Sequence, residues 1–170
     1  MSADDTKKTP ERPTQEISLR INGKTVTEEV EPRLKLSDFL RNYVDLKGVR
    51  VGCEHGICGA CTVRVDGANI KSCMVYAVQT DGSEILTVEG LNENGSLHPI
   101  QEAFNEEHAL QCGFCTSGFV MSTFDLLEDN PNPSKSEMKD HLGSNICRCT
   151  GYQNIYKAVD SAAEKMEGED

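Results

Sequence analysis

The sequence contains no tryptophan, only four histidines and no run of five or more basic residues. Lys and Arg together number 17, against 28 Asp and Glu, which gives a formal net charge of −11. A surface that binds nucleic acid needs clustered positive charge to neutralise phosphates, so this composition argues against nucleic acid as a partner. A protein partner with a basic surface is expected instead.

Long hydrophobic segments are also missing. No apolar run approaches the ~18 residues of a membrane span, and residues 1–15 hold neither the apolar core of a secretory signal nor a twin-arginine pair. We therefore expect a cytoplasmic protein without a membrane span. Because thiols stay reduced in the cytoplasm, the eight cysteines of this 170-residue chain indicate metal ligation or redox chemistry sooner than a disulfide framework.

The hydrophobic period changes along the chain and predicts two domains. It is about two in the first half and about 3.6 in the second, and the polar, turn-rich segment 89–96 lies between them. Residues 16–92 are expected to form one domain and residues 93–166 another. Residues 1–15 and 167–170 are mostly polar or charged, so we expect a flexible extension and an acidic tail.

The first half predicts a small sheet crossed by one helix. Apolar residues alternate with polar ones over 17–21, Asn22-Gly23 suits a type I′ turn, and 26–30 returns as a second strand. Leu36, Phe39, Leu40 and Val44 lie at helical spacing. Further strands are expected at 62–66, 70–73 and 84–88. This order indicates a ubiquitin-like β-grasp domain of the plant-type ferredoxin kind.

The second half predicts an all-α domain of four helices, so the fold class of the chain is α+β. Apolar spacing indicates helices over 97–108 and 119–127. Two capping-box pairs, Ser134 with Glu137 and Thr150 with Gln153, predict where the last two helices begin.

Four cysteines in the first half have the ligand spacing of plant-type ferredoxins, which bind a [2Fe–2S] cluster. The set is Cys53-x4-Cys58-x2-Cys61, followed by Cys73. Glycines and an alanine between them leave backbone N–H groups free to reach sulfur. Two alternatives stay open: a zinc site that uses the Cys-x2-Cys pair, and a Rieske-type centre that uses His55.

The other four cysteines are Cys112-x2-Cys115 and Cys147-x-Cys149, each pair just before a predicted helix. A helix N-terminus presents free N–H groups and the positive end of the helix dipole, which favours an anionic cluster there. Alone, Cys112 and Cys115 also suit a thioredoxin-like dithiol or half of a zinc site. Beside a complete ferredoxin set, four further thiols favour a second [2Fe–2S] cluster.

Three segments carry a resemblance to a known family: 52–63 (GCEHGICGACTV), 111–116 (QCGFCT) and 145–153 (NICRCTGYQ). Over residues 17 to about 163, the chain resembles the small iron–sulfur subunit of bacterial molybdenum hydroxylases of the xanthine dehydrogenase and carbon monoxide dehydrogenase type. The resemblance implies a large molybdopterin-binding catalytic subunit and a medium FAD-binding subunit as partners, in a dimer of heterotrimers.

The resemblance also implies roles for individual residues. Cys53, Cys58, Cys61 and Cys73 would hold the outer cluster, on the flavin side, and Cys112, Cys115, Cys147 and Cys149 the inner cluster, near the pterin. Gln111 and Cys149 would contact the pterin cofactor, although an exposed polar residue is the simpler interpretation of Gln111. The chain departs from the family at Ser117, where proline is common, and at Ser144, where glycine usually precedes the asparagine.

The implied function is electron transfer within a multi-subunit oxidoreductase. Single electrons would pass from the molybdopterin centre through two [2Fe–2S] clusters to FAD, and this chain would have no catalytic residue or substrate-binding site of its own. The alternative is a free-standing iron–sulfur carrier or redox-sensing module. The substrate stays open, because the substrate pocket belongs to another polypeptide.

Overall fold

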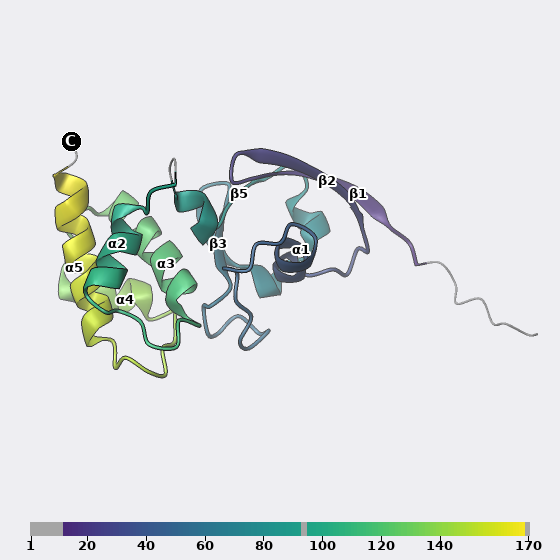
Figure 1. Cartoon of the computed structure of the whole chain (residues 1–170). Helices are drawn as coiled ribbons and strands as arrows, with labels where there is room; N and C mark the ends of the chain where they lie inside the picture. Colours follow the sequence, from purple (N-terminus) through teal and green to yellow (C-terminus); the bar gives the residue numbers. More distant parts are fainter. Residues whose placement is uncertain (1–11, 93–94, 169–170) are drawn as a thin grey trace, which may run out of the picture.

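One mixed β-sheet and five α-helices make up the protein, as the computed structural model of residues 12–92 and 95–168 shows. Figure 1 shows the sheet and helix α1 on one side of the molecule and helices α2 to α5 on the other. The predicted flexible extension and acidic tail lie largely outside the described residues, so their flexibility stays a prediction.

The N-terminal hairpin forms as the alternating pattern predicts. Strands β1 (Gln15–Ile21) and β2 (Lys24–Val30) pair antiparallel, and Ile17, Leu19 and Ile21 are buried. Asn22 and Gly23 have φ angles of 48° and 78°, which confirms the type I′ turn. The first strand begins one residue earlier than the predicted domain.

Five strands form the sheet in the order β2-β1-β5-β3-β4. Strand β5 (Glu84–Leu86) pairs parallel with β1 and antiparallel with β3 (Thr62–Val65), and β3 pairs antiparallel with β4 (Ala68–Lys71). Helix α1 (Leu36–Asn42) buries Leu36, Phe39 and Leu40 in the same hydrophobic core as β1. The apolar face of α1 therefore packs against the sheet, as the spacing of its apolar residues predicts.

Two predicted strands end earlier than expected and continue as 3-10 turns. After β4, the chain turns at η1 (Ser72–Met74), where Ser72 Oγ donates a hydrogen bond to the Cys61 carbonyl at 2.7 Å. After β5, η3 (Val88–Leu91) begins, and the Thr87 N–H donates to Asn22 Oδ1 at 2.9 Å. A third turn, η2 (Ala77–Thr80), lies between them. The first turn brings Cys73 back towards Cys61.

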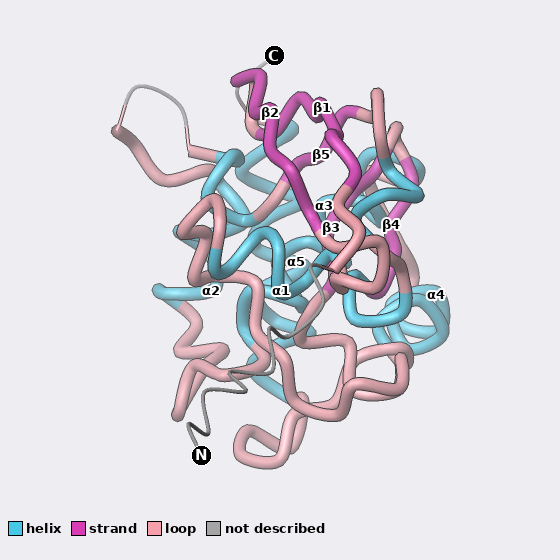
Figure 2. The backbone as a smooth tube through the Cα atoms, turned by 90° about the vertical axis from the view of Figure 1, so that its right-hand side faces the viewer, coloured by secondary structure: helices cyan, strands magenta, loops and turns pink. Residues whose placement is uncertain are grey.

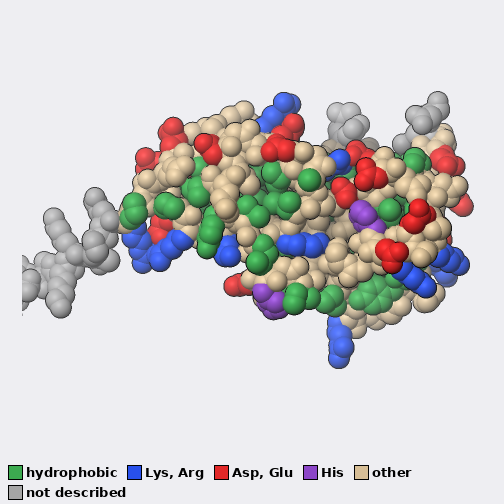
Figure 3. All heavy atoms as spheres, turned by 180° about the vertical axis from the view of Figure 1, so that it is seen from behind, with side chains coloured by type: hydrophobic (Ala, Val, Ile, Leu, Met, Phe, Trp, Pro, Cys, Tyr) green, Lys and Arg blue, Asp and Glu red, His purple; other side chains and the backbone are tan. Residues whose placement is uncertain are grey.

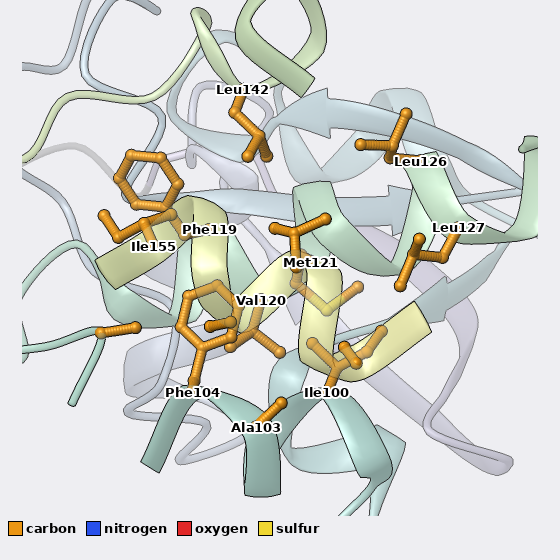
Figure 4. Close-up of a cluster of buried hydrophobic side chains, with 14 of the residues drawn as sticks. Ile100, Ala103, Phe104, Phe119, Val120, Met121, Leu126, Leu127, Leu142 and Ile155 are labelled. Carbon is orange, nitrogen blue, oxygen red and sulfur yellow. The ribbon is translucent and has the colours of Figure 1, made fainter. Parts of the chain in front are cut away.

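The helical half has a separate hydrophobic core. Its helices are α2 (Pro99–Glu106), α3 (Thr116–Asp129), α4 (Lys135–Leu142) and α5 (Gln153–Glu167). Figure 4 shows Phe104, Phe119 and Ile155 converging from three of these helices, and all three are buried. Helix α5 continues one residue into the segment predicted as a tail.

One of the two predicted capping boxes forms, and the other does not. Glu137 N–H donates to Ser134 Oγ at 3.3 Å, and Ser134 N–H donates to Glu137 Oε2 at 2.7 Å, as predicted for α4. The prediction for α5 is wrong, because Tyr152 precedes that helix with a φ of 68°. The Thr150 hydroxyl instead donates to Cys147 Sγ at 3.1 Å.

Helix α3 joins the two halves by packing against β3 and β4. Asn69 Nδ2 on β4 donates to the Met121 carbonyl at 3.1 Å. Arg64 on β3 forms an ion pair with Glu128, and its guanidinium lies 5.3 Å from the centre of the Phe124 ring. The loops that carry the cysteines, which follow α1 and precede α3 and α5, reach the same lower side of the molecule in Figure 1, and Figure 2 shows long loops gathered there from a second direction.

The surface carries mixed charge. On the face shown in Figure 3, Lys and Arg lie singly or in small groups among Asp and Glu. Within residues 12–92 and 95–168, no helix is long and apolar enough to cross a membrane.

Candidate metal centres

The first cysteine set lies in the loop between α1 and β3 and in the turn η1. Cys61 and Cys73 are buried, whereas Cys53 and Cys58 are half-buried. The Cys58 N–H donates to Cys53 Sγ at 3.4 Å. Cys58 is among the groups that shift the pKa of Cys53, and Cys61 is among those that shift the pKa of Cys73, so the four thiols fall into two neighbouring pairs.

Backbone N–H groups in this loop favour the thiolate form of Cys53, the first cysteine of the set. Donation from the Cys58 N–H, and then from those of His55 and Ile57, lowers the pKa of Cys53 to about 6. Burial, with a further contribution from the neighbouring Cys61 thiol, raises the pKa of Cys73 to about 11, and the Gly56 N–H opposes this shift. Because thiolate is the form that binds metal, these donors suit a loop that wraps a cluster.

His55, the residue that a Rieske-type centre would use, is exposed. Its Nδ1 lies in hydrogen-bond contact with the Cys53 carbonyl oxygen. This ring nitrogen faces a backbone group, so the structure supports no ligand role for it here.

The second cysteine set lies in two loops before α3 and α5. Cys112 Sγ and Cys149 Sγ are 3.6 Å apart, and Cys115 pairs with Cys147. Burial and the neighbouring Cys147 thiol raise the pKa of Cys115 to about 12. Although burial opposes it, hydrogen bonds from the Thr150 hydroxyl and N–H and from the Cys149 N–H lower the pKa of Cys147.

Two residues beside this set were not identified from the sequence. Tyr152 places its hydroxyl oxygen 3.0 Å from the Cys147 N–H, which donates to it. Thr150, expected to cap a helix, donates to Cys147 Sγ instead. The sequence feature that could have identified both residues is their position immediately after the Cys-x-Cys pair, where a side chain can fold back onto the loop.

Gln111 lies beside Cys149. Its Nε2 donates to the Cys149 carbonyl at 3.0 Å. Gln111, Cys112 and Cys149 are all exposed, in contrast to Cys147. This edge of the second set is therefore open to a partner molecule.

The arrangement of the sulfurs fits two [2Fe–2S] clusters. A cluster of this type needs two thiolates on each of two irons, and each set consists of two pairs. All eight cysteines are free thiols. Across the described parts of the chain, no three His, Cys, Asp or Glu side chains are grouped as they would be around one ion. Thr116 Oγ1 and Ser117 Oγ, directly after Cys115, are buried without a protein partner among the described residues.

The two sets are joined by direct hydrogen bonds between their loops, one from a backbone N–H and one from a side-chain amide. The Ile146 N–H donates to the Cys58 carbonyl at 2.9 Å, and Asn145 Nδ2 donates to the Gly59 carbonyl at 3.0 Å. Ile146 is bonded directly to Cys147. One hydrogen bond and a few covalent bonds therefore link a cysteine of the first set to a cysteine of the second.

Two glycines allow the loop of the first set to approach Asn145 and helix α3 closely. A Cβ on Gly59, whose φ is +71°, would lie 2.5 Å from Asn145 Nδ2, and a Cβ on Gly118 of α3 would lie 2.2 Å from the Gly59 carbonyl oxygen. A side chain at Gly59 would push this loop away from Asn145, and one at Gly118 would push it away from α3. Ser144, the residue that replaces the usual glycine, does not have a positive φ, so its side chain is accommodated without backbone strain.

Large hydrophobic side chains are exposed beside both sets. Ile57 and Met74, near the first set, are 58% and 52% exposed, and Phe114 and Ile146, near the second, are 43% and 47% exposed. Exposed apolar groups around two candidate centres are typical of surfaces that partner proteins cover.

Two family models match the chain in succession. Residues 19–90 match a 2Fe-2S iron-sulfur cluster binding domain, and residues 87–160 match a [2Fe-2S] binding domain. Together they account for nearly the whole described chain.

Similar proteins are subunits of oxidoreductases. The chain is 54% identical to the nicotine 6-hydroxylase small subunit of Paenarthrobacter nicotinovorans, over 85% of this chain and 87% of that protein. It is 47% identical to the caffeine dehydrogenase subunit gamma of Pseudomonas sp. (strain CBB1), over 89% of this chain and 92% of that protein. The structure of quinoline 2-oxidoreductase from Pseudomonas putida 86 aligns with a TM-score of 0.87 and 44% identity, over 91% of this chain and 97% of that chain.

Proposed function

The chain belongs to the family of small iron–sulfur subunits of molybdenum hydroxylases, and from this premise we propose how its own residues carry electrons. It is an electron-transfer subunit of a multi-subunit oxidoreductase with two [2Fe–2S] clusters, and molybdopterin and FAD are bound by partner subunits.

The cysteine pairs assign the ligands. One pair of the first set would hold each iron of the outer cluster, and one pair of the second set would hold each iron of the inner cluster. Gln111 and the exposed Cys149 would contact the pterin cofactor of the large subunit. This assignment is supported by the 3.0 Å hydrogen bond that holds Gln111 against Cys149.

The observation that supports electron transfer between the two cysteine sets is the hydrogen bond from the Ile146 N–H to the Cys58 carbonyl. When bound, each cluster accepts and releases one electron at a time. The chain's task is then to fix the distance between two such sites, because the rate of transfer depends on it. The bond joins the two loops directly, and Gly59, next to Cys58, and Gly118 are both buried.

The finer architecture is also part of the proposal. We propose that residues 16–92 are a β-grasp domain of the plant-type ferredoxin kind and residues 93–166 an all-α [2Fe–2S] domain. The mixed sheet crossed by α1 and the separate cores support this division. A dimer of heterotrimers and a cytoplasmic location stay predictions, the former to be tested by light scattering of the purified complex.

The substrate is decided in the large subunit. The three similar proteins named above are named for nicotine, caffeine and quinoline, which are all N-heterocyclic compounds. We therefore propose an N-heterocycle as the substrate class of the complex. Turnover of aldehydes but not of N-heterocycles by the purified complex would contradict this proposal.

The test of electron transfer is a Cys115→Ser substitution in the complete complex. Because Cys115 is assigned to the inner cluster, we expect the variant to lose electron transfer from molybdenum to flavin while the partner subunits keep their cofactors. Stopped-flow absorbance of the reduced complex measures this transfer. Wild-type complex should contain four irons per small subunit and show two paramagnetic species on full reduction.

A Ser136→Ala substitution is the matched control, because Ser136 is an exposed residue of α4. This variant should transfer electrons at the wild-type rate. Normal reoxidation of molybdenum through the Cys115→Ser complex would overturn the assignment of the inner cluster.

A further inference from the structure

Lys71 places an ammonium group between the two cysteine sets. It is the last residue of β4, two positions before Cys73, and its side chain is half-buried. Lys71 Nζ donates to Thr62 Oγ1 at 2.8 Å, and Thr62 directly follows Cys61. The same Nζ donates to Ser144 Oγ, on the loop of the second set, at 3.3 Å.

The sulfurs of the first set attract this ammonium. Burial lowers the pKa of Lys71, and the negative charges of Cys61, Cys58 and Cys73 oppose that shift, in this order of strength. Cys61 and Cys73 form one of the two pairs of the set. Because Thr62 directly follows Cys61 and Lys71 is two residues before Cys73, the ammonium lies beside the part of the first set that holds these two cysteines.

Hydrogen bonds fix the ammonium in this position. Ser144 Oγ accepts a hydrogen bond from Lys71 and donates one to Asn145 Oδ1 at 3.0 Å. Asn145 Nδ2 in turn donates to the Gly59 carbonyl. The lysine is thus held by the first residue of β3 on one side and by the loop of the second set on the other.

We propose that Lys71 raises the reduction potential of the outer cluster relative to that of the inner cluster. This inference rests on the proposed function. Reduction adds one electron to the outer cluster as the inner cluster loses one, so negative charge arrives beside the ammonium. A fixed positive charge in a partly buried site stabilises the reduced form, and the transfer from inner to outer cluster becomes more favourable.

The test is a Lys71→Met substitution in the complete complex, with both potentials measured by a redox titration followed by electron paramagnetic resonance. Methionine keeps an apolar stem and removes the charge. We expect the outer potential to fall by about 59 mV, which corresponds to a tenfold change in a one-electron equilibrium. The inner potential should change by much less.

Two control variants separate charge from structure. Lys71→Arg keeps the charge and should retain the wild-type outer potential. Lys24→Met removes an exposed lysine from the first hairpin and should change neither potential. If Lys71→Met does not assemble with four irons, Lys71→Gln gives the same comparison with a polar side chain.

The outcomes distinguish this inference from the proposed function. An unchanged outer potential in Lys71→Met, or an equal shift of both clusters, overturns the role of Lys71. Fewer than two paramagnetic species in the wild-type complex would instead overturn the two-cluster proposal itself.

Discussion

At the residue scale, single side chains decide the environment of individual sulfurs. Thr150 shows this most clearly, because both its hydroxyl and its N–H donate to Cys147 Sγ, at 3.1 Å and 3.4 Å. The two bonds lower the pKa of a buried thiol whose burial alone would raise it. The same bonds would stabilise added negative charge on a bound cluster.

A Thr150→Val substitution removes one of these donors and keeps the shape of the side chain. We expect the reduction potential of the inner cluster to become more negative, by roughly half or more of the 59 mV that corresponds to a tenfold one-electron equilibrium. Redox titration of the complex measures the shift. Thr150→Ser keeps the hydroxyl and should retain the wild-type potential; an equal shift in both variants would contradict this account.

At the scale of elements, the N-terminal turn of α3 sits directly on the loop of the first set. Gly118 is buried there, against the Gly59 carbonyl and Asn145. Asn145 is itself buried, accepts from Ser122 Oγ at 2.8 Å and donates to Gly59. Helix and loop therefore meet backbone to backbone, with one asparagine satisfying the polar groups at the contact.

A Gly118→Ala substitution would place a methyl group into this contact, where the nearest atom is a backbone oxygen at 2.2 Å. Because neither backbone yields easily, we expect a loss of about 1–3 kcal/mol of unfolding free energy. Chemical denaturation measures it. Gly168→Ala, whose Cβ would have its nearest atom at 3.6 Å, should leave stability unchanged. An unchanged unfolding free energy in Gly118→Ala would contradict the prediction and show that α3 and the loop separate without cost.

At the scale of the whole molecule, two hydrophobic cores support the loops that carry the cysteines. One core lies between the sheet and α1, and the other lies among α2, α3, α4 and α5. Most of their members lie outside the cysteine loops, and only Cys61, Cys73 and Cys147 belong to both a core and a cysteine set. The secondary structure therefore has its own hydrophobic stabilisation. We expect the cysteine loops to gain further stabilisation from bound clusters.

Removal of iron from the purified chain by a chelator under reducing conditions should separate these contributions. We expect far-UV circular dichroism to change little, while the Tm falls by about 6–12 °C for a loss of ~3 kcal/mol in a chain of this size. Limited proteolysis should then cut within the cysteine loops first. Readdition of iron and sulfide provides the control, and complete loss of the dichroism signal on iron removal would contradict the prediction.

The elements that follow from local pattern could be predicted from the sequence. The alternation of Ile17, Leu19 and Ile21 with polar residues determined the first strand, and Asn22-Gly23 determined its turn, because these preferences act between neighbours. The spacing of the cysteines predicted two sets of four for the same reason. The sequence could not predict which cysteines lie next to each other, such as Cys53 with Cys58 and Cys112 with Cys149. A spacing along the chain does not specify the distances between sulfurs.

Tertiary contacts decided the features that local pattern predicted wrongly or not at all. Thr150 matched a capping box, yet its hydroxyl bonds to Cys147, because the loop folds back before α5 begins. Lys71 reads as an ordinary charged end of a strand, and only the approach of Ser144 from the other half makes it a fixed charge. Partners that are brought together from distant parts of the chain leave no periodic trace in it, so the folded structure alone could reveal them.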